Sequence, residues 1–381
     1  MQKDNSMIQL FFAGDFCSKP STARISVSEE LRSLIQSCDL KVVNFEVPLK
    51  PGIEMPHQKR ERFYQNDDAP GFLKDMGFNL FQMANNHAFD WGDAGFLKTK
   101  EAVGNAAFGA GTYEEAYQVK IVEVKGLRIG FMALSFAAYA GVFDDVTNHE
   151  GLGCAYINDL RVNHDIIEAK KTVDYLFILP HDGIEYIDVP LPETIARYRD
   201  FIDYGADGVI GTHPHCPQGW ETYKGKPIFY SLGNFLFNSK EGYDYRATNR
   251  PHWYEGLCVK MTIADGELSW DVINTRNVDN VGIVIDHDEE RCAHNRKICN
   301  YLLDHEAYMS YLTPILTKQA EKDLKVFRRV FLPQNAKEAW AVFWNALRGA
   351  KPSSKDEMSY VLKNDTRRAR MISFLKSLFR K

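Results

Sequence analysis

The chain has 381 residues, which allows one large α/β domain with an appendage, and its 45% hydrophobic and 25% charged residues are typical of a globular protein. A net charge of −5 argues against a nucleic-acid partner, and no apolar run reaches the roughly 18 residues that span a bilayer. Seven cysteines without a repeating spacing, and no signal peptide, predict reduced thiols in a cytoplasmic protein.

Two apolar runs near the N-terminus predict the first strands. Residues 7–13 form one run, and Asp15 follows it; residues 40–45 form the second, which delivers Asn44 and Glu46. Ligand sites in α/β sheets lie beyond the carboxyl ends of strands, so these polar side chains are candidate ligands of a hard or borderline cation.

A polar loop and a third strand come next. Residues 50–66 are rich in Arg, Lys and Gln, and they form either a solvated loop or a loop over the site that contacts an anionic substrate. The run 78–84 predicts a strand, and Asn86, His87 and Asp90 follow it. Removing several polar groups from water beyond a strand end is energetically costly, which favours a functional role for them.

The middle of the chain repeats this pattern. Residues 120–124 and 127–134 predict a β-hairpin, 158–171 a helix, and 175–179 a buried strand that His181 closely follows.

The segment around residue 213 carries the densest cluster. A short apolar run at 209–210 predicts a strand, and His213 and His215 follow it. In an extended segment, positions two apart point to the same side, so both imidazoles can reach one metal ion or two adjacent ions. Residues 230–235 predict the next strand beside them.

Five predicted strand ends therefore carry carboxylate, amide or imidazole groups. A mixture of oxygen and imidazole ligands suits Mn, Fe or Zn, so the sequence predicts a centre with one or two divalent metal ions. The residues at these strand ends are Asp15, Asn44, Glu46, Asn86, His87, His181, His213 and His215.

The C-terminal third changes character. Strands at 256–263 and 268–273 are expected to close the second sheet, and helices are expected at 289–312, 315–329 and 335–349.

Two further features of this third leave alternatives open. Cys292 and Cys299 flank His294, but the second ligand pair that such a zinc site needs is missing. Residues 366–381 carry six basic side chains and no acid on an amphipathic pattern. This tail can make peripheral contact with the inner face of a membrane, or dock on its own domain or on a partner.

Taken together, the motifs resemble those of the CapA family (PGA_cap), the bacterial capsule or poly-γ-glutamate synthesis proteins, a branch of the calcineurin-like metallophosphoesterase superfamily. The resemblance covers roughly residues 7–240. It rests on Gly14-Asp15, Asn44-Phe45-Glu46, Ala84-Asn85-Asn86-His87 with Asp90 and Gly92, His181-Asp182-Gly183-Ile184-Glu185, Gly211-Thr212-His213-Pro214-His215 with Gln218 and Glu221, and Tyr230-Ser231-Leu232-Gly233-Asn234-Phe235.

The resemblance implies a four-layer α/β/β/α metallophosphoesterase-like sandwich with a two-metal site. It places Asp15 and His215 on the first metal, and Glu46 where a bridging Asp usually stands. The second metal would take Asn86, His181 and His213. Cys17 occupies the position of a superfamily histidine, which the CapA family itself generally lacks.

The same resemblance implies further roles. His87 would be a non-ligand general acid, with Asp90 as its catalytic partner. The other motif residues, expected to bind substrate, are Asn44, Glu185, Gln218, Glu221 and Asn234.

The resulting hypothesis is a CapA-like, metal-dependent hydrolase that acts on an acyl or phosphoryl bond of a cell-envelope polymer or its precursor. The alternative is a non-catalytic assembly factor that works with other polymer-synthesis proteins. The predicted domains are the metallophosphoesterase-like domain at 1–285, a helical extension at 286–350, and a linker with the basic tail at 351–381.

Overall fold

The computed structural model describes residues 7–331 apart from 53–61, 138–140, 145–148 and 239–249. The chain divides into two compact units. The first contains residues 1–136 and 140–300, and the second contains residues 137–139 and 301–381. The helix predicted at 335–349 and the basic tail at 366–381 lie outside the described residues.

The first unit contains a sheet of nine described strands, in the order β2-β17-β16-β15-β1-β3-β4-β5, with β14 also paired to β1. The apolar strand β1 is central, parallel to β3 and β14 and antiparallel to β15. The strand bounds are β1 Ile8–Ser18, β2 Ser26–Val27, β3 Leu40–Phe45, β4 Leu80–Gln82, β5 Ala107–Phe108, β14 Asn234–Asn238, β15 Glu255–Ala264, β16 Glu267–Val278 and β17 Gly282–Ile285.

A second sheet, of six described strands, has the order β12-β13-β11-β10-β8-β7. The predicted hairpin forms its β7 and β8, which pair antiparallel. A two-stranded sheet joins β6 to β9. The bounds are β6 Ala110–Gly111, β7 Lys120–Val124, β8 Leu127–Ser135, β9 Gly153–Cys154, β10 Tyr175–His181, β11 Gly208–Ile210, β12 Trp220–Tyr223 and β13 Lys226–Phe229.

The two large sheets pack face to face through aromatic side chains. The ring of Phe12 in β1 lies 5.6 Å from that of Phe177 in β10 and 6.3 Å from that of Phe131 in β8. Such buried aromatic contacts remove a large apolar area from water and hold the layers together.

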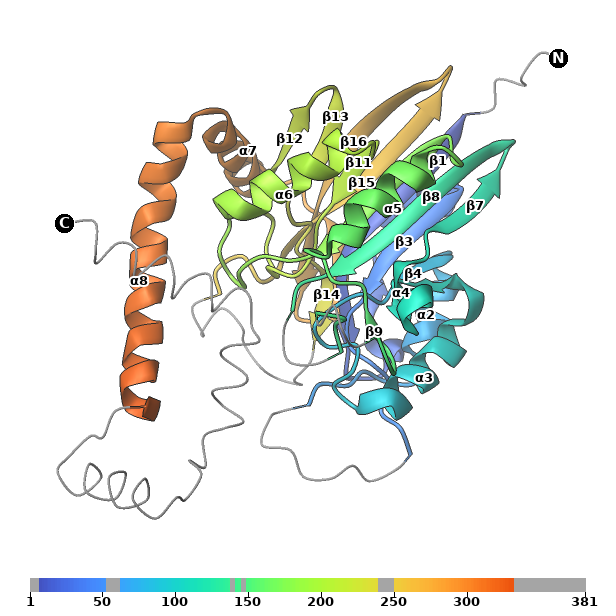
Figure 1. Ribbon diagram of the computed structural model, residues 1–381, viewed down its shortest axis with the longest axis horizontal. Coiled ribbons are helices and arrows are strands. Elements are labelled where there is room, and N and C mark those ends of the chain that lie inside the picture. Colours follow the sequence, from blue (N-terminus) through green and yellow to red (C-terminus); the bar gives the residue numbers. More distant parts are fainter. Residues whose placement is uncertain (1–6, 53–61, 138–140, 145–148, 239–249, 332–381) are drawn as a thin grey trace. The chain divides into compact units, whose positions relative to one another are not determined.

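Helices complete the outer layers, so the predicted four-layer α/β/β/α arrangement is confirmed. Helices α5 and α6 lie along the outer face of the second sheet (Figure 1). On the first sheet, α2 packs through Phe72 against Phe16 of β1, and α1 packs on β17. The helices of this unit are η1 Thr22–Arg24, α1 Glu29–Ser37, α2 Ala69–Asp75, α3 Gly92–Val103, η2 Gly104–Ala106, α4 Tyr113–Tyr117, α5 Leu160–Lys170 and α6 Pro192–Asp203, and α7 Glu289–Leu303 begins in it and ends in the second unit.

Three expectations about strands need correction. Strands β15 and β16 do not close the second sheet, because β15 pairs with β1 in the first sheet. Residues 230–233 are not a strand but connect β13 to β14. His181 does not follow a strand but is the last residue of β10.

The C-terminal helices also differ from the prediction. A break at Asp304 separates α7 from α8 (His305–Phe331), whereas one helix was expected over 289–312. Pro314 lies within α8 and does not end it, although proline removes a backbone donor. None of the described helices combines the length and the hydropathy that a membrane-crossing segment requires.

Gly14 is a position where any side chain would collide with the backbone. A Cβ atom there would lie 1.9 Å from the carbonyl oxygen of Gly233, and Asp15 N donates to the same oxygen at 2.9 Å. We therefore expect Gly14→Ala to lower the free energy of unfolding by about 1–3 kcal/mol or more, measured by urea denaturation. Gly71→Ala, in α2 with open space around its Cβ position, is the matched control and should not destabilise. Equal midpoints for the two variants would contradict this prediction.

Candidate metal centre

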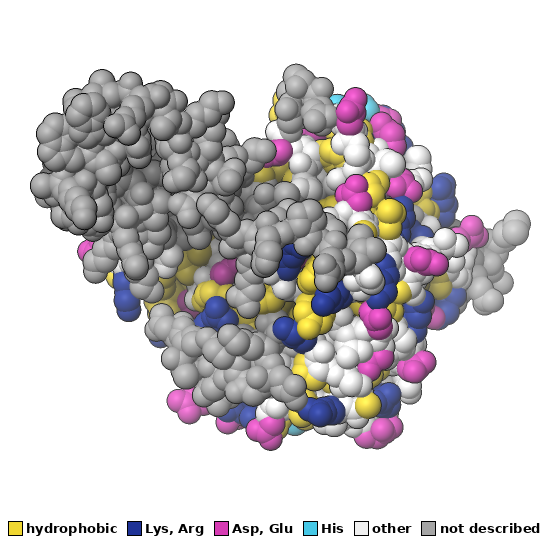
Figure 2. All heavy atoms as spheres, turned by 90° about the horizontal axis from the view of Figure 1, so that it is seen from below, with side chains coloured by type: hydrophobic (Ala, Val, Ile, Leu, Met, Phe, Trp, Pro, Cys, Tyr) yellow, Lys and Arg dark blue, Asp and Glu magenta, His cyan; other side chains and the backbone are white. Residues whose placement is uncertain are grey.

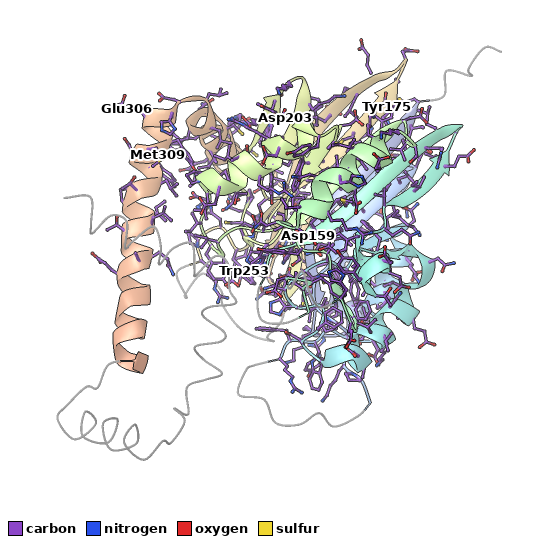
Figure 3. The ribbon with its side chains drawn as sticks, in the orientation of Figure 1. Asp159, Tyr175, Asp203, Trp253, Glu306 and Met309 are labelled. Carbon is purple, nitrogen blue, oxygen red and sulfur yellow. The ribbon has the colours of Figure 1, made fainter. Side chains whose placement is uncertain are left out.

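The strand ends of both sheets bring the predicted polar residues together. Asp15 does not follow the first strand, as we expected, but lies within β1, which continues to Ser18 and whose pairing register shifts near Asp15. Glu46 directly follows β3, and His181 ends β10. Figure 3 places Tyr175, the first residue of β10, at one end of the strands and Trp253 at the other, where loops gather.

One group of potential ligands contains Asp15, Glu46 and His215. Their ligand atoms all lie within 4.8 Å of one another. His215 Nδ1 is 3.5 Å from Asp15 Oδ2, and His215 Nε2 is 3.6 Å from Glu46 Oε1. All three side chains are buried.

A second group shares Glu46 and adds His181 and His213, again with ligand atoms within 4.8 Å. His181 Nε2 lies 3.6 Å from Glu46 Oε1 and 3.2 Å from His213 Nδ1. Asn86 joins this group, because its Oδ1 is 2.9 Å from His181 Nε2. Glu46 is thus the residue that the two groups have in common.

The charge state of the centre indicates that it is built for cations. Among the described residues, neither carboxylate oxygen of Glu46 has a hydrogen-bond partner. Burial raises the pKa of Asp15 to about 7, and burial together with the charge of Asp15 raises the pKa of Glu46 well above its usual range. Burial also lowers the pKa of His181 and lowers that of His215 to about 4, so both imidazoles favour the neutral form that binds metals.

Hydrogen bonds fix the orientation of the histidines. His215 Nδ1 lies 2.9 Å from Asn234 Oδ1, and His181 Nδ1 lies 3.0 Å from the hydroxyl of Thr212. When each Nδ1–H donates to that oxygen, Nε2 keeps its lone pair for a ligand. Asn44 donates from Nδ2 to Asp15 Oδ1 at 2.7 Å. Asn44 and Asn234, which we predicted to bind substrate, therefore hold the centre's own side chains; their contact with substrate stays a prediction.

His213 and His215 reach the centre by a different route from the one predicted. The segment is not extended: His213 has φ of 104° and His215 has φ of 57°. Non-glycine residues rarely adopt positive φ, and such strain is concentrated at functional sites. His213 N also donates to Asp15 Oδ2 at 3.2 Å, so the turn is tied to β1.

His87 and Asp90 form a buried pair beside the centre. His87 Nδ1 lies 2.8 Å from Asp90 Oδ2, and the same oxygen accepts a hydrogen bond from Phe63 N at 3.0 Å. The ring of Phe63 meets that of His87 edge-on at 5.0 Å. The arrangement fixes the imidazole in one orientation, as a positioned acid or base requires. Neither residue belongs to the ligand groups of the described chain.

The other residues assigned to substrate make internal contacts. Gln218 donates from Nε2 to the carbonyl oxygens of Ile187 and Val189 at 2.7 and 3.1 Å. Glu221 forms an ion pair with Arg199 at 2.6 Å. Burial raises the pKa of Glu185, but the neighbouring His213 and a hydrogen bond with Tyr186 are among the interactions that lower that pKa overall. Their role toward substrate stays a prediction.

Cys17 lies in a separate apolar cluster with Val47, Phe237, Trp253 and Tyr254. Burial raises the pKa of its thiol, which disfavours a thiolate ligand. Cys17 belongs to none of the ligand groups among the described residues.

A set of aromatic and basic residues lies around the centre, and only those of the segment 50–66 had been considered from the sequence. Trp253 packs against His215 with ring centroids 5.0 Å apart, and Tyr186 stacks on the same imidazole at 6.1 Å. The guanidinium of Arg250 lies over both aromatic rings, at 4.3 Å from Tyr186 and 5.0 Å from Trp253. A second such group places Lys19, Lys50 and Arg62 over Tyr64 and Trp91.

We call these eight residues, Lys19, Lys50, Arg62, Tyr64, Trp91, Tyr186, Arg250 and Trp253, the basic-aromatic rim. In the view from below, Lys and Arg side chains gather beside hydrophobic ones on the visible surface (Figure 2). Lys50, Arg62 and Tyr64 belong to the basic segment 50–66, for which contact with an anionic substrate was one of the two alternatives, whereas the other five residues carry no periodic signal and were not predicted.

The raised pKa of Asp15 has a consequence for the metal-free protein. Between the usual pKa of 3.8 and about 7, the folded chain keeps a proton that the unfolded chain has released. Stability should therefore fall as pH rises from 6.5 to 8, by roughly 1 kcal/mol from Asp15 alone. Below pH 6.5 the buried His181 and His215 have the opposite effect on stability. Their pKa is lowered in the folded chain, so the unfolded chain binds protons that the folded chain does not, and stability rises with pH. Urea denaturation in EDTA measures this slope, and Asp15→Asn should reduce it; an unchanged slope in the variant would contradict the assignment.

Comparison with known proteins gives a family match. The family model described as "Bacterial capsule synthesis protein PGA_cap" matches residues 9–239. The capsule biosynthesis protein CapA of Bacillus anthracis is 29% identical over 215 residues, which cover 54% of this chain and 52% of that protein. The PGA biosynthesis protein CapA of Bacillus subtilis is 30% identical over 220 residues, covering 56% and 57%. The chain thus matches about half the length of these relatives.

Among solved structures, one described as a novel phosphatase from Mycoplasma pneumoniae covers 76% of this chain and 97% of its own. Its sequence identity is 14% and its TM-score is 0.41.

Proposed function

The chain belongs to the PGA_cap family of bacterial capsule synthesis proteins, and on this basis we propose that it is a metal-dependent hydrolase. Its proposed substrate is an anionic cell-envelope polymer, such as poly-γ-glutamate, or the precursor of one. The bond it cleaves is an acyl or phosphoryl bond.

The observation that carries this proposal is the pair of buried acids, Asp15 and Glu46, among imidazoles; neither carboxylate oxygen of Glu46 has a hydrogen-bond partner among the described residues. Burying unpaired carboxylates is expensive unless they coordinate metals. The surrounding donors are imidazole nitrogens and an amide oxygen, which fit Mn, Fe or Zn. When bound, one or two such ions would supply a Lewis acid that lowers the pKa of water.

The residues of the centre would have different roles in metal binding and catalysis. Asp15 and His215 would hold one ion, Asn86, His181 and His213 the other, and Glu46 would serve both. His87, oriented by Asp90, would donate a proton to the leaving group. The basic-aromatic rim supports a polymer with negative charge, because guanidinium and ammonium groups bind carboxylates and phosphates.

A second candidate function is a non-catalytic accessory role in polymer synthesis. Cys17 favours this accessory role. The superfamily enzymes usually have a histidine at this position, whereas Cys17 is buried in an apolar cluster and adds no ligand to the centre. In this role the metal would hold the fold rather than perform chemistry.

An activity assay with purified protein tests the proposal. Protein stripped with EDTA is reloaded with Mn²⁺, Fe²⁺ or Zn²⁺ and offered a phosphomonoester, a phosphodiester and poly-γ-glutamate. We expect metal-dependent cleavage of at least one, weaker at high salt if the rim binds the substrate through charge. Stoichiometric metal binding without turnover of any of these substrates would overturn the hydrolase proposal and favour the accessory role.

A further inference from the structure

A second cluster of metal-type side chains lies outside the centre described above. It joins Asp188, from the loop after β10, His252, just before β15, and His294 in α7. One ligand atom from each lies within 4.8 Å of the others. All three residues belong to the first compact unit. We propose that they form a separate site for a transition-metal ion of the zinc class.

The spacing of the donor atoms suits such an ion. Asp188 Oδ2 lies 3.0 Å from His294 Nε2 and 3.8 Å from His252 Nε2. Two ligands of a tetrahedral zinc ion lie roughly 3.3 Å apart, since each Zn–N or Zn–O bond is about 2.0–2.2 Å. The distances of 3.0 and 3.8 Å bracket that value. Both imidazoles therefore present Nε2 to the same carboxylate oxygen.

Glu255 orients one of the ligands. Its Oε2 lies 2.9 Å from His252 Nδ1, on the side of the ring away from Asp188. When Nδ1–H donates to this carboxylate, Nε2 keeps its lone pair for a metal ion. A carboxylate behind a histidine is the usual arrangement at zinc sites, where it fixes the tautomer and strengthens the ligand.

The cluster borders a cavity, which leaves room for a further ligand. The cavity has a volume of about 410 Å³, and His252, Glu255, Glu290 and His294 are among the residues that line it. The rings of His252 and His294 are nearly parallel, with centroids 4.3 Å apart. The two imidazoles can thus occupy neighbouring ligand positions while the cavity supplies water to another.

The cysteines near His294 do not take part. Cys292 Sγ donates to the carbonyl oxygen of Asp286 at 3.4 Å, and Cys299 Sγ accepts a hydrogen bond from Trp220 N at 3.3 Å. Neither sulfur belongs to a ligand group of the described chain. The sequence pattern therefore paired His294 with the wrong residues. The proposed co-ligands are Asp188 and His252, which lie 106 and 42 positions earlier in the chain.

The expected role of this ion is structural. It would tie α7 to the loop after β10 and to the start of β15, three segments that are distant in the sequence. An ion held by the folded chain alone stabilises the fold by mass action.

Metal content separates this site from the buried centre. We expect His252→Ala/His294→Ala to bind one equivalent of Zn²⁺ fewer than the wild type, measured by elemental analysis after equilibrium dialysis. His164→Ala, which removes an exposed histidine of α5, is the control and should keep the full amount. Glu255→Gln should keep all ligands but weaken Zn²⁺ binding by about 10–100-fold. Equal zinc content in the double variant and the control would overturn the proposal and leave the cluster as ion pairs.

A second set of variants controls for loss of Zn²⁺ binding through misfolding. In Glu46→Gln/His181→Ala, which removes the shared carboxylate and one histidine of the buried centre, calorimetric titration should still detect one Zn²⁺ site. That site should disappear when His252 and His294 are also replaced. Far-UV circular dichroism in EDTA should be the same for all variants. A folded background variant that binds no Zn²⁺ would equally overturn the proposal.

Discussion

Glu46→Gln is expected to make the metal-free protein more stable and, at the same time, to abolish metal-dependent hydrolysis. Glutamine has nearly the same shape but carries no charge, so it relieves the repulsion from Asp15 and the cost of burying a carboxylate that has no hydrogen-bond partner among the described residues. We expect the free energy of unfolding in EDTA at pH 8 to rise by about 1–3 kcal/mol. Metal affinity should fall at least 100-fold, because both ligand groups lose the negative charge of the carboxylate that they share.

Glu221→Gln is the matched control for this variant. Glu221 is also a buried glutamate, but Arg199 pairs with it at 2.6 Å, and Tyr230 donates a hydrogen bond to it at 2.5 Å. Removing its charge should lower the free energy of unfolding by about 1–3 kcal/mol. This loss is smaller than for a fully buried ion pair, because Arg199 is partly exposed to solvent. Metal affinity should stay unchanged. Urea denaturation and calorimetric titration give both quantities. If Glu46→Gln were destabilising and kept its metal, Glu46 would be an ordinary structural residue.

Much of the centre could be predicted because each of its residues lies close to a short apolar run. Strand ends in an α/β sheet meet at one edge, so polar residues at Asp15, Glu46, His181 and His213 had to converge if the strands were assigned correctly. The structure brings these side chains to within a few ångströms of one another. Local patterns therefore sufficed for the residues that strands deliver.

The conformation of the turn that carries His213 and His215 could not be predicted from the sequence pattern. Alternation explains why His213 and His215 would point the same way in a strand, yet positive φ at both residues turns them toward Glu46 instead. This conformation depends on contacts with distant residues, such as the hydrogen bond from His213 N to Asp15. Periodicity carries no information about such contacts.

Long-range partners account for the other differences. The pairing of β15 with β1, rather than with the second sheet, joins residues about 250 positions apart. Asp188, His252 and His294 come from three segments, each of which contributes one of these three residues. A motif read along the chain finds His294 beside two cysteines, whereas the fold gives it a carboxylate and an imidazole.

His87→Gln tests whether the centre performs chemistry, and it rests on the proposed hydrolase activity. Glutamine can keep a hydrogen bond to Asp90 but cannot deliver a proton as an acid. We expect kcat to fall by about 10²–10⁴-fold on substrates whose leaving group needs a proton, with metal content and KM unchanged. A substrate with a good leaving group, such as a nitrophenyl ester, should lose much less, because its departure does not depend on the acid.

Asp90→Asn separates positioning from acid catalysis. Asparagine keeps the hydrogen bond from Phe63 N but loses the charge that orients the imidazole of His87. Its kcat should lie between those of the wild type and His87→Gln, and the same leaving-group dependence should remain. Steady-state kinetics over a series of leaving groups measures this. If His87→Gln slowed good and poor leaving groups equally, His87 would support the architecture of the centre and would not act as its acid.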